Sequence, residues 1–384
     1  MASCPGAACT DQPSTREAGR GRHARRTGAS TEWGTPRDGL GQTACVSSEI
    51  ARGIHTMLWR KPGDVVEGFA LEELSDHLQE EDCLVWVDLC DPSPDGLATL
   101  AEELLLDPHA VEDSLATAER PKATRHTSHT FVTVYATRLV LGGDGQRGVL
   151  ESRLETDRLS VFVLPGGVVT VRPDDRFDMD EVVRRWSDFP DLLEHGSGAL
   201  LHGLLDVVVD GHFDTIQALD DAIEALEDDL FEETGTRQLQ QRTYRLRKEL
   251  VELRRVVLPM REVVNTVMRH RADSNGLTSD LDGWYTDLYD HVLRASEWTE
   301  SLRDMITTVF ETNIALQDAR LNVVMKKLTG WAAIIAVPTA VTGWFGMNVA
   351  YPGIGKTSGF VASAVVIPAL AVTLYILFKR RNWI

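Results

Sequence analysis

The chain has 384 residues, with 58 acidic and 39 basic side chains and a formal net charge of −19 at pH 7. Such a surface would repel a phosphate backbone, so the composition excludes a general nucleic-acid-binding protein. The hydrophobic content of 43% is typical of a protein with a sizeable core. The five cysteines form no C-x-x-C pair, which argues against a zinc site or a disulfide framework and indicates a reducing, cytoplasmic setting.

Residues 1–56 are rich in Gly, Ser, Thr and Arg and show no hydrophobic periodicity. We therefore expect a disordered N-terminal tail. The segment has no apolar core of signal-peptide length. An alternative is that translation begins at Met57, where the first strand-like and helix-like patterns occur, and the sequence is compatible with both.

Residues 57–190 alternate between strand and helix patterns. Runs typical of β-strands occupy residues 84–89, 130–141, 159–164 and 168–171. Helix patterns lie around residues 95–106 and 108–118. Gly-rich turns follow two of the strands, at Gly142-Gly143-Asp144-Gly145 and at Pro165-Gly166-Gly167. These alternations predict an α/β cytoplasmic domain.

Residues 191–327 are assigned to a helical hairpin and a long stalk helix. After Arg172 the strand pattern ends, and helices are predicted at residues 175–186, 198–233 and 237–269, the last two joined near Thr234-Gly235. Acidic side chains dominate residues 214–233, whereas cations gather in residues 242–255. This sorting fits either two antiparallel helices that attract each other or two solvated faces, and solvation is the commoner origin of charge runs.

The stalk sequence contains no Gly or Pro between Trp284 and Thr329. Its apolar residues recur at spacings of mostly three and four, at Leu281, Tyr285, Leu288, Val292, Ala295, Leu302, Met305 and Val309. The pattern predicts a helix that continues into the first membrane span, about 90 Å long at 1.5 Å per residue. Because such a rod cannot bury its apolar stripe alone, we expect it to pack against copies of itself in a homo-oligomer.

Residues 328–384 are predicted to form a membrane domain. The stretches 328–345 and 360–378 carry no charge, and each approaches the roughly 20 residues that cross a bilayer as a helix. Cations flank both spans, at Lys326, Lys327, Lys379, Arg380 and Arg381. The positive-inside rule then places both termini in the cytoplasm and the loop 348–358 outside the cytoplasmic membrane. Two spans are too thin to enclose a pore, so transport requires a ring of subunits with the first span along its axis.

The triplet Gly346-Met347-Asn348 follows a first span that contains Pro338-Thr339. In these features the chain resembles the CorA family of magnesium and divalent-cation transporters, whose signature is Gly-Met-Asn at the outer end of the first span. Further matches are Glu112-Asp113, Arg120-Pro121-Lys122, Pro259-Met260-Arg261-Glu262 and Asp287-Leu288-Tyr289-Asp290-His291. The resemblance covers residues 57–384. It implies a funnel-shaped homo-oligomer, a pentamer, built from an α/β cytoplasmic domain, long stalk helices and two transmembrane helices.

The resemblance implies that Gly346, Met347 and Asn348 form a selectivity filter. Mg²⁺ dehydrates reluctantly, so a ring of neutral Asn348 amide oxygens that holds its water shell suits this ion. Helical spacing and the resemblance together place the pore-lining and gate residues at Asn322, Met325, Leu328, Thr329, Ala332, Ala336, Thr339 and Gly343. Met325 and Leu328 would form apolar constrictions that gate by dewetting. The alternative interpretation is that both are ordinary helix-packing residues.

The chain departs from the family pattern at two places. Ala336 stands where relatives often have a bulky Met, which removes one expected constriction. The outer loop lacks the Pro-Glu pair of many relatives and carries Lys356 instead, so its attraction for cations should be weaker. These differences leave the transported ion open.

The resemblance also places Asp113 and Asp287 at a subunit interface, where together they bind a regulatory divalent ion. Carboxylates brought together across an interface repel each other unless a cation bridges them, so internal Mg²⁺ would hold the ring closed. The alternative is that each is an ordinary exposed carboxylate. The pair His126-x-x-His129 has no Cys or acidic residue at ligand spacing, and we expect it to be structural.

No P-loop of the form GxxxxGK[ST] occurs, so ATP-driven pumping is not indicated and no enzyme activity or cofactor is expected. The sequence predicts passive, channel-type transport of hydrated Mg²⁺, with Co²⁺ and Ni²⁺ as further candidate ions, gated by intracellular Mg²⁺. One alternative is a zinc-selective or proton-coupled transporter of the ZntB type. Another is a membrane-anchored regulatory or scaffold protein whose spans only tether the α/β domain.

Overall fold

A computed structural model describes residues 51–60, 64–140, 153–231, 236–275, 280–347, 350 and 355–384. Residues 1–50 of the expected tail, the Gly142-Gly143-Asp144-Gly145 turn, the Thr234-Gly235 junction and Asn348 lie outside these ranges. Predictions for those residues therefore stay predictions.

A seven-stranded sheet forms the first part of the described chain, with the strand order β2-β1-β3-β7-β6-β5-β4. Its strands are β1 (Ala51–Arg60), β2 (Asp64–Glu67), β3 (Cys83–Pro92), β4 (Lys122–Arg125), β5 (Thr130–Val140), β6 (Arg153–Leu164) and β7 (Gly167–Arg172). The pair β3 and β7 is parallel, and the other neighbours are antiparallel. The four predicted strand runs became β3, β5, β6 and β7. The hairpin at Gly166 joins β6 to β7, as the turn pattern indicated.

Strand β1 corrects the predicted end of the tail. It begins at Ala51, and residues 51–56 pair with β3 from Ala51 opposite Pro92 to Thr56 opposite Val87. Met57 lies in the middle of this strand and is 6% exposed. A chain that starts at Met57 would therefore lack six of the ten residues of a strand that contributes to the core.

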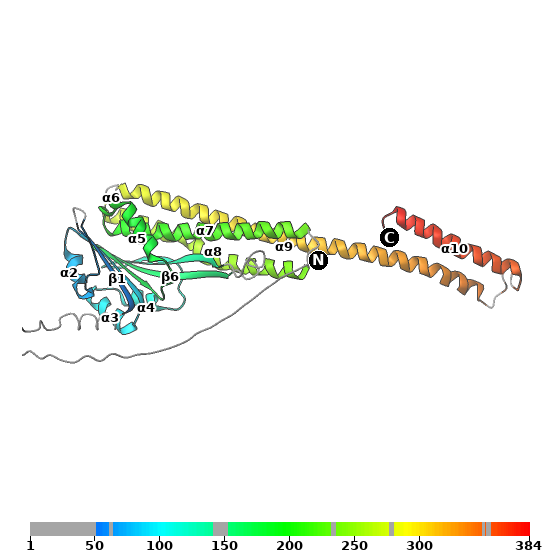
Figure 1. Ribbon diagram of the computed structural model, residues 1–384, viewed down its shortest axis with the longest axis horizontal. Helices are drawn as coiled ribbons and strands as arrows, with labels where there is room; N and C mark the ends of the chain where they lie inside the picture. The colour runs from blue at the N-terminus through cyan, green and yellow to red at the C-terminus, as the bar shows by residue number, and fades with distance from the viewer. Residues whose placement is uncertain are drawn as a thin grey trace, which may run out of the picture. The chain divides into compact units, whose positions relative to one another are not determined.

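Helices cover both faces of the sheet (Figure 1). One face carries the 3₁₀ turn Leu71–Glu73, α2 (Leu74–Gln79), α3 (Pro94–Glu103) and α4 (Pro108–Leu115), packed on Val85, Val87 and Leu89. The other face carries α5 (Met179–Asp188), α6 (Pro190–Leu193) and α7 (Ser197–Phe231), packed on Leu84 and Trp86. Successive residues of a strand point to opposite faces, so β3 supplies both cores. The predicted α/β class is confirmed.

The α3 and α4 helices begin at defined caps. Ser93 accepts a hydrogen bond from the Gly96 backbone N–H, and Asp107 accepts hydrogen bonds from the N–H groups of His109 and Ala110. Each cap is followed by a proline in the first turn, a position that tolerates the missing N–H. The cap at Asp107 fixes the start of the helix that carries Asp113.

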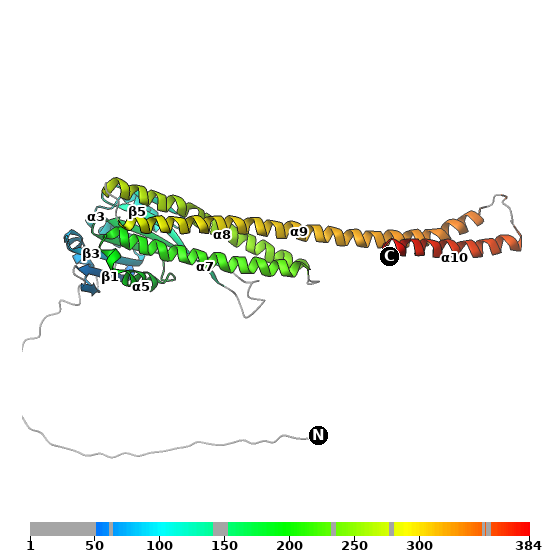
Figure 2. The same ribbon diagram turned by 90° about the horizontal axis from the view of Figure 1, so that it is seen from above.

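Three long helices follow: α7, α8 (Thr236–Asn275) and α9 (Asp280–Phe345). Figure 2 shows α7 and α8 beside the N-terminal part of α9. Their shared core joins Ile223 of α7, Leu253 of α8 and Ile306 of α9, each at most 1% exposed. One cation of the basic stretch, Arg242, lies 2.5 Å from Asp229 across the α7–α8 pair, and Arg254 instead contacts Glu300 of α9 at 2.6 Å.

Helix α9 is one helix of 66 residues, about 99 Å at 1.5 Å per residue, which confirms that stalk and first span are continuous. The expectation that its apolar stripe packs against copies of itself is wrong for the N-terminal part of the stalk, up to Val309. Leu302 and Val309 are 0% and 1% exposed because α7 and α8 of the same subunit cover them. Leu316 still packs against this core, but beyond Gln317 the cover ends, and Leu321 and Val324 are 62% and 59% exposed. The apolar surface available to another copy therefore lies further along the helix.

Candidate functional site

In the part of the chain that the structure describes, two helices are long and apolar enough to cross a membrane: α9, with a mean hydropathy of 1.4 in its apolar window, and α10 (Thr357–Arg380), with 2.4. Almost none of either window is buried against the rest of the subunit. Since a buried core helix of a soluble protein would be covered by its own chain, the exposure favours lipid or further subunits as the surroundings.

Helix α10 packs back along the C-terminal part of α9 (Figure 2). Gly330 allows this close approach, because a Cβ built there would lie only 3.0 Å from the Ile384 side chain. The rings of Trp331 and Tyr375 are 6.4 Å apart, and Phe378 stacks on Trp383 at 5.5 Å. The C-terminal residues therefore pack against α9 at Gly330, near the start of the first span.

The candidate pore residues form one exposed stripe on α9. All of Asn322, Met325, Leu328, Thr329, Ala332, Ala336, Thr339 and Gly343 are exposed. The buried and half-buried positions of the same segment are Gly330, Ala333, Ile334, Val337, Pro338, Val341 and Phe345. At 100° per residue the two sets are centred roughly 150° apart around the helix. The face that α10 covers is therefore not the face that carries the stripe.

The stripe contains no charged residue, as predicted. Met325 and Leu328 are 57% and 62% exposed, so neither packs within its own subunit. The alternative that these two are helix-packing residues would therefore require contacts with another subunit. Two apolar side chains on adjacent turns, left open by the fold, are available either to line an axis or to contact another copy.

The outer end of the stripe is only partly described. Helix α9 ends at Phe345, and the Gly346 N–H donates to the Thr342 carbonyl at 2.9 Å. Met347 is 42% exposed. Asn348, the predicted centre of the filter, lies outside the described residues. Lys356 is exposed at the N-cap position of α10, near the same end of the two spans.

The two predicted regulatory carboxylates lie on different elements. Asp113 of α4 has its Oδ2 2.6 Å from the Nζ of Lys122, which also lies 3.3 Å from Glu119. Burial lowers the pKa of Lys122, but its hydrogen bonds to the two carboxylates outweigh this and raise the pKa above its ordinary value. Asp287 of α9 is far more exposed and lies 3.8 Å from His291. Among the described residues no three His, Cys, Asp or Glu side chains come together to hold a metal within one subunit.

The His126 and His129 rings stack with their centroids 4.8 Å apart. Although no acidic residue stands at ligand spacing in the sequence, Asp107 Oδ2 lies 3.3 Å from His126 Nδ1 in the fold. Sequence spacing missed this contact because Asp107 reaches the pair from the cap of α4. Burial and the neighbouring His126 lower the pKa of His129 to about 4, which makes it a neutral, structural imidazole.

The fold and the exposed stripe define a class: a membrane protein with two spans, one of them the end of a long stalk helix below an α/β domain. The family model described as CorA-like Mg²⁺ transporter protein matches residues 81–380. The chain therefore belongs to the CorA family of divalent-cation transporters.

Individual relatives agree with this assignment. The cobalt/magnesium transport protein CorA of Thermotoga maritima is 25% identical over 306 residues, 76% of this chain and 80% of that protein. The protein of the same name from Methanocaldococcus jannaschii is 25% identical over 328 residues, 84% and 98% of the two chains. The complete structure of the M. jannaschii CorA magnesium transporter superimposes with a TM-score of 0.66 at 20% identity, covering 86% of this chain and 98% of that one. This last match concerns the fold.

Proposed function

We propose that the chain is one subunit of a homopentameric channel that carries hydrated Mg²⁺ passively across the cytoplasmic membrane. Co²⁺ and Ni²⁺ are further ions of the same charge that such a path would admit. The observation that carries the proposal is the uncharged stripe of α9 from Asn322 to Gly343. The subunit leaves this stripe exposed both before the first span and along it. A ring of such helices would turn the stripes toward a common axis.

The chemistry of the stripe suits a hydrated ion. Hydroxyl, amide and small side chains exchange hydrogen bonds with a water shell without binding the ion tightly. Met325 and Leu328 would narrow the path near its cytoplasmic end and close it by dewetting. With Ala336 in place of a bulky side chain, the constriction at Met325 and Leu328 would be the main one. The filter at Gly346, Met347 and Asn348 would select ions at the outer mouth.

The orientation follows from the distribution of cations. Lys326 and Lys327 precede the span of α9, and Lys379, Arg380 and Arg381 follow α10, which favours a cytoplasmic location for both termini. The α/β domain would then lie in the cytoplasm, where it is exposed to the internal Mg²⁺ concentration.

Regulation by internal Mg²⁺ would use Asp113 and Asp287 of neighbouring subunits. Carboxylate oxygens are ligands that suit Mg²⁺. Within one subunit, the described residues bring no further His, Cys, Asp or Glu side chains together with either carboxylate to complete a metal site. The contact between Lys122 and Asp113 implies that a bridging ion must compete with an internal ammonium group. The site would therefore respond at a higher Mg²⁺ concentration than a pair of free carboxylates.

The test is a flux assay with the purified oligomer in liposomes that contain a Mg²⁺-sensitive dye. We expect uptake driven by the ion gradient alone. It should be lost when Met325 and Leu328 are both replaced by the bulkier Trp, and retained in the control variant Val366→Ala of α10. Faster Zn²⁺ uptake that requires a pH gradient would instead identify a transporter of the ZntB type. The absence of flux of any divalent ion from a correctly assembled oligomer would favour the membrane-anchored scaffold.

A further inference from the structure

The last part of the chain has a charge opposite to that of the whole. Residues 319–384 contain seven basic side chains and no Asp or Glu, whereas the whole chain has a net charge of −19. All of the seven except Lys356 lie on the side of the spans that we place in the cytoplasm. Because no acidic side chain of this segment neutralises them, they concentrate positive charge at that end of the spans.

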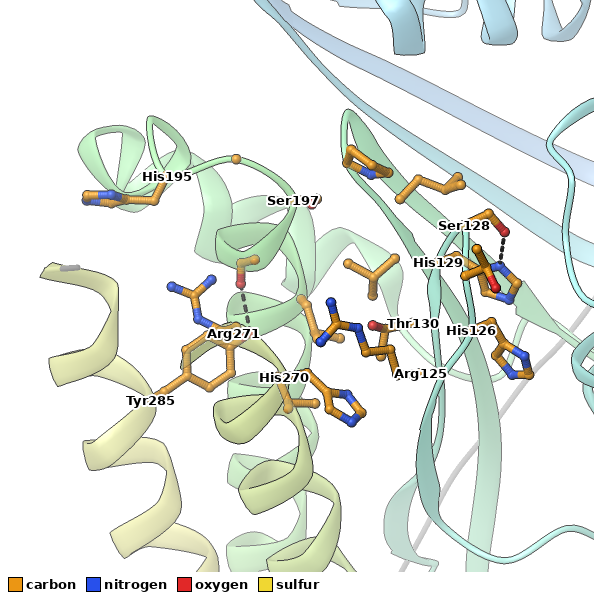
Figure 3. A pocket seen from close by; sticks show the side chains of 18 residues that line it. Arg125, His126, Ser128, His129, Thr130, His195, Ser197, His270, Arg271 and Tyr285 are labelled. Atoms are coloured by element: carbon orange, nitrogen blue, oxygen red, sulfur yellow. Dashed lines mark hydrogen bonds between the residues drawn. The ribbon is translucent and has the colours of Figure 1, made fainter. Parts of the chain in front are cut away.

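Arg271, far from the spans, shows how a cation is held within the subunit. It lines a cavity of about 460 Å³ near the start of α9, where Figure 3 shows it beside Tyr285. Its guanidinium carbon lies 5.1 Å from the centre of the Tyr285 ring, and its Nη2 lies 3.5 Å from Asp282. The lysines beside the spans, in contrast, form no ion pair with any residue that the structure describes. Their charge is available to a partner outside the subunit.

Two of these lysines belong to a row of four side chains that crosses from α9 to α10. On α9, Lys327 precedes Trp331 by four residues, so the two side chains are neighbours on one face of the helix. The Trp331 ring lies 6.4 Å from the Tyr375 ring of α10. Tyr375 in turn precedes Lys379 by four residues, and Lys379 Nζ lies 5.8 Å from the centre of its ring. In this lysine–aromatic row, two ammonium groups flank a pair of rings that joins the two helices.

The lysine–aromatic row is open on the surface of the subunit. Both lysines are exposed, and Trp331 and Tyr375 are 49% and 38% exposed. At 100° per residue, Lys327 and Trp331 lie roughly 140° around α9 from the centre of the uncharged stripe. When the stripes of the proposed ring face its axis, the row therefore points away from the ion path and toward the surrounding membrane.

The row stands where a span meets the water. Lys327 immediately precedes the first uncharged stretch, and Lys379 immediately follows the second. Trp and Tyr rings favour this depth, at the level of the lipid headgroups. About one turn further into the spans, exposed aliphatic side chains follow on both helices, at Ile335 and Val372, which are 66% and 55% exposed. The surface thus changes from cationic to aromatic to aliphatic in the direction of the membrane interior.

A phospholipid with an acidic headgroup matches this order. Lysine side chains are long and flexible, so both ammonium groups can turn toward one phosphate and bind it with charge-assisted hydrogen bonds. The glycerol region would rest on the two rings, and an acyl chain would follow the aliphatic side chains into the span. A free phosphate ion would use the two lysines alone. The apolar part of the surface therefore favours a lipid as the source of the phosphate.

We infer that the lysine–aromatic row binds the headgroup of an anionic phospholipid in the cytoplasmic leaflet. The inference rests on the proposed function in one respect, since it takes α9 and α10 as membrane spans with their basic ends in the cytoplasm. The lipid site is separate from the ion path and from the proposed regulatory carboxylates Asp113 and Asp287.

The experiment uses the purified full-length oligomer in detergent and counts bound lipids by native mass spectrometry. The lipids are phosphatidylglycerol and phosphatidylcholine with the same short acyl chains, and the competitor is glycerol 3-phosphate, which has a phosphate but no chain. We expect phosphatidylglycerol to bind at least about fivefold more tightly than phosphatidylcholine. Glycerol 3-phosphate at the same concentration should not displace it. Equal affinity for the two lipids, or displacement by glycerol 3-phosphate, overturns the inference.

Variants distinguish this site from the general positive charge of the surface. Lys327→Gln with Lys379→Gln should abolish the preference for phosphatidylglycerol, whereas Arg at both positions should keep it. The control Lys326→Gln with Arg380→Gln removes two charges at the same depth, but each residue lies about 100° around its helix from the row. This control should retain most of the preference. An equal loss of preference in the control and in the lysine pair contradicts the site.

Ion flux measured on the same preparations separates this inference from the proposed function. An oligomer that prefers phosphatidylglycerol but carries no divalent ion would contradict the channel and support the lipid site. An oligomer that carries Mg²⁺ but binds both lipids equally would contradict the lipid site alone.

Discussion

The Nζ of Lys122 lies 2.6 Å from Oδ2 of Asp113, so the carboxylate proposed to bind regulatory Mg²⁺ is already paired with an ammonium group of its own subunit. Both side chains are about a quarter to a third exposed, which makes the pair neither a solvated surface contact nor a fully buried one. If Asp113 binds Mg²⁺ as proposed, Lys122 would compete with the ion, and the strength of the pair would set the Mg²⁺ concentration at which the ion displaces the ammonium group.

The competition predicts the effect of Lys122→Gln. Removing the ammonium group should strengthen Mg²⁺ binding at Asp113, and a partly exposed pair contributes up to about 1 kcal/mol, a factor of roughly five. The internal Mg²⁺ concentration for half-inhibition of flux should fall two- to fivefold. The exposed lysine variant Lys248→Gln is the control. Half-inhibition at an unchanged or higher concentration in Lys122→Gln would show that the pair does not compete with the ion.

Removal of both carboxylates should have the opposite effect. In Asp113→Asn with Asp287→Asn, permeation is expected to stay at the wild-type level while inhibition by internal Mg²⁺ is relieved, because no charged oxygen remains to bridge the subunits. Currents recorded from excised patches at stepped internal Mg²⁺ concentrations measure both properties. Currents that still close at the wild-type concentration would remove these two residues from the sensor.

The filter assignment predicts that Asn348→Ala abolishes Mg²⁺ uptake without affecting assembly. The amide oxygen would be lost at the point where the pore helix meets the loop, and Lys356 at the start of α10 offers no oxygen in its place. Uptake by liposomes and sedimentation of the detergent-solubilised oligomer are measured together. Wild-type uptake in the variant would exclude Asn348 as the selective group.

Two substitutions in α9 separate folding from assembly. Leu302 is 0% exposed within the subunit, so Leu302→Asp should destabilise the subunit itself by more than about 4 kcal/mol. Leu321 is 62% exposed, so Leu321→Asp should leave the subunit folded and dissociate the oligomer. Circular dichroism reports the first effect and sedimentation the second. A folded, fully assembled Leu321→Asp protein would place the oligomer contact elsewhere.

Acid should destabilise the subunit through His212. Burial lowers the pKa of this imidazole to about 4, although its Nε2–H donates to the Tyr135 carbonyl at 2.8 Å. The unfolded chain takes up the proton below pH 6.5 and the folded chain only near pH 4, so stability is present above pH 6.5 and declines toward pH 4. The difference corresponds to roughly 3 kcal/mol.

The matching measurement is the unfolding midpoint in denaturant between pH 7 and pH 4. His212→Gln keeps a donor for the Tyr135 carbonyl but cannot titrate, so its midpoint should fall less with acid than that of the wild type. The exposed His109→Gln should follow the wild-type curve. Parallel curves for wild type and His212→Gln would contradict the role of His212.

The strands that could be predicted are those whose apolar residues repeat over a buried length, such as β3 with its Val85 and Val87. Strand β4, of four residues, and β2, fully exposed, have no such repeat and were missed. Helix α8 runs through Pro259, as predicted, and ends at Asn275, six residues beyond the predicted end. Packing against α7 and α9 outweighs the one hydrogen bond that the proline removes.

The candidate site was less predictable. The stripe of α9 could be read from helical spacing, because a straight helix fixes which residues share a face. The partner of the apolar residues nearer the start of α9, such as Leu302, could not be predicted. Helical spacing alone does not distinguish a neighbouring helix of the same chain from another copy. The contacts of Asp113 with Lys122 and of His126 with Asp107 depend on how α4 sits on the sheet, which no local pattern contains.

Because α9 is one continuous helix, a movement at its start can be transmitted to its far end. Tyr285 lines the cavity in the α/β region, and Gly343 lies near the outer end of the same helix, about 87 Å away. If the helix moves as a rigid rod, a tilt of about 1° at one end displaces the other end by roughly 1.5 Å. An ion held at Asp287, near the start of this helix, would therefore change the width of the proposed ion path through a small local movement.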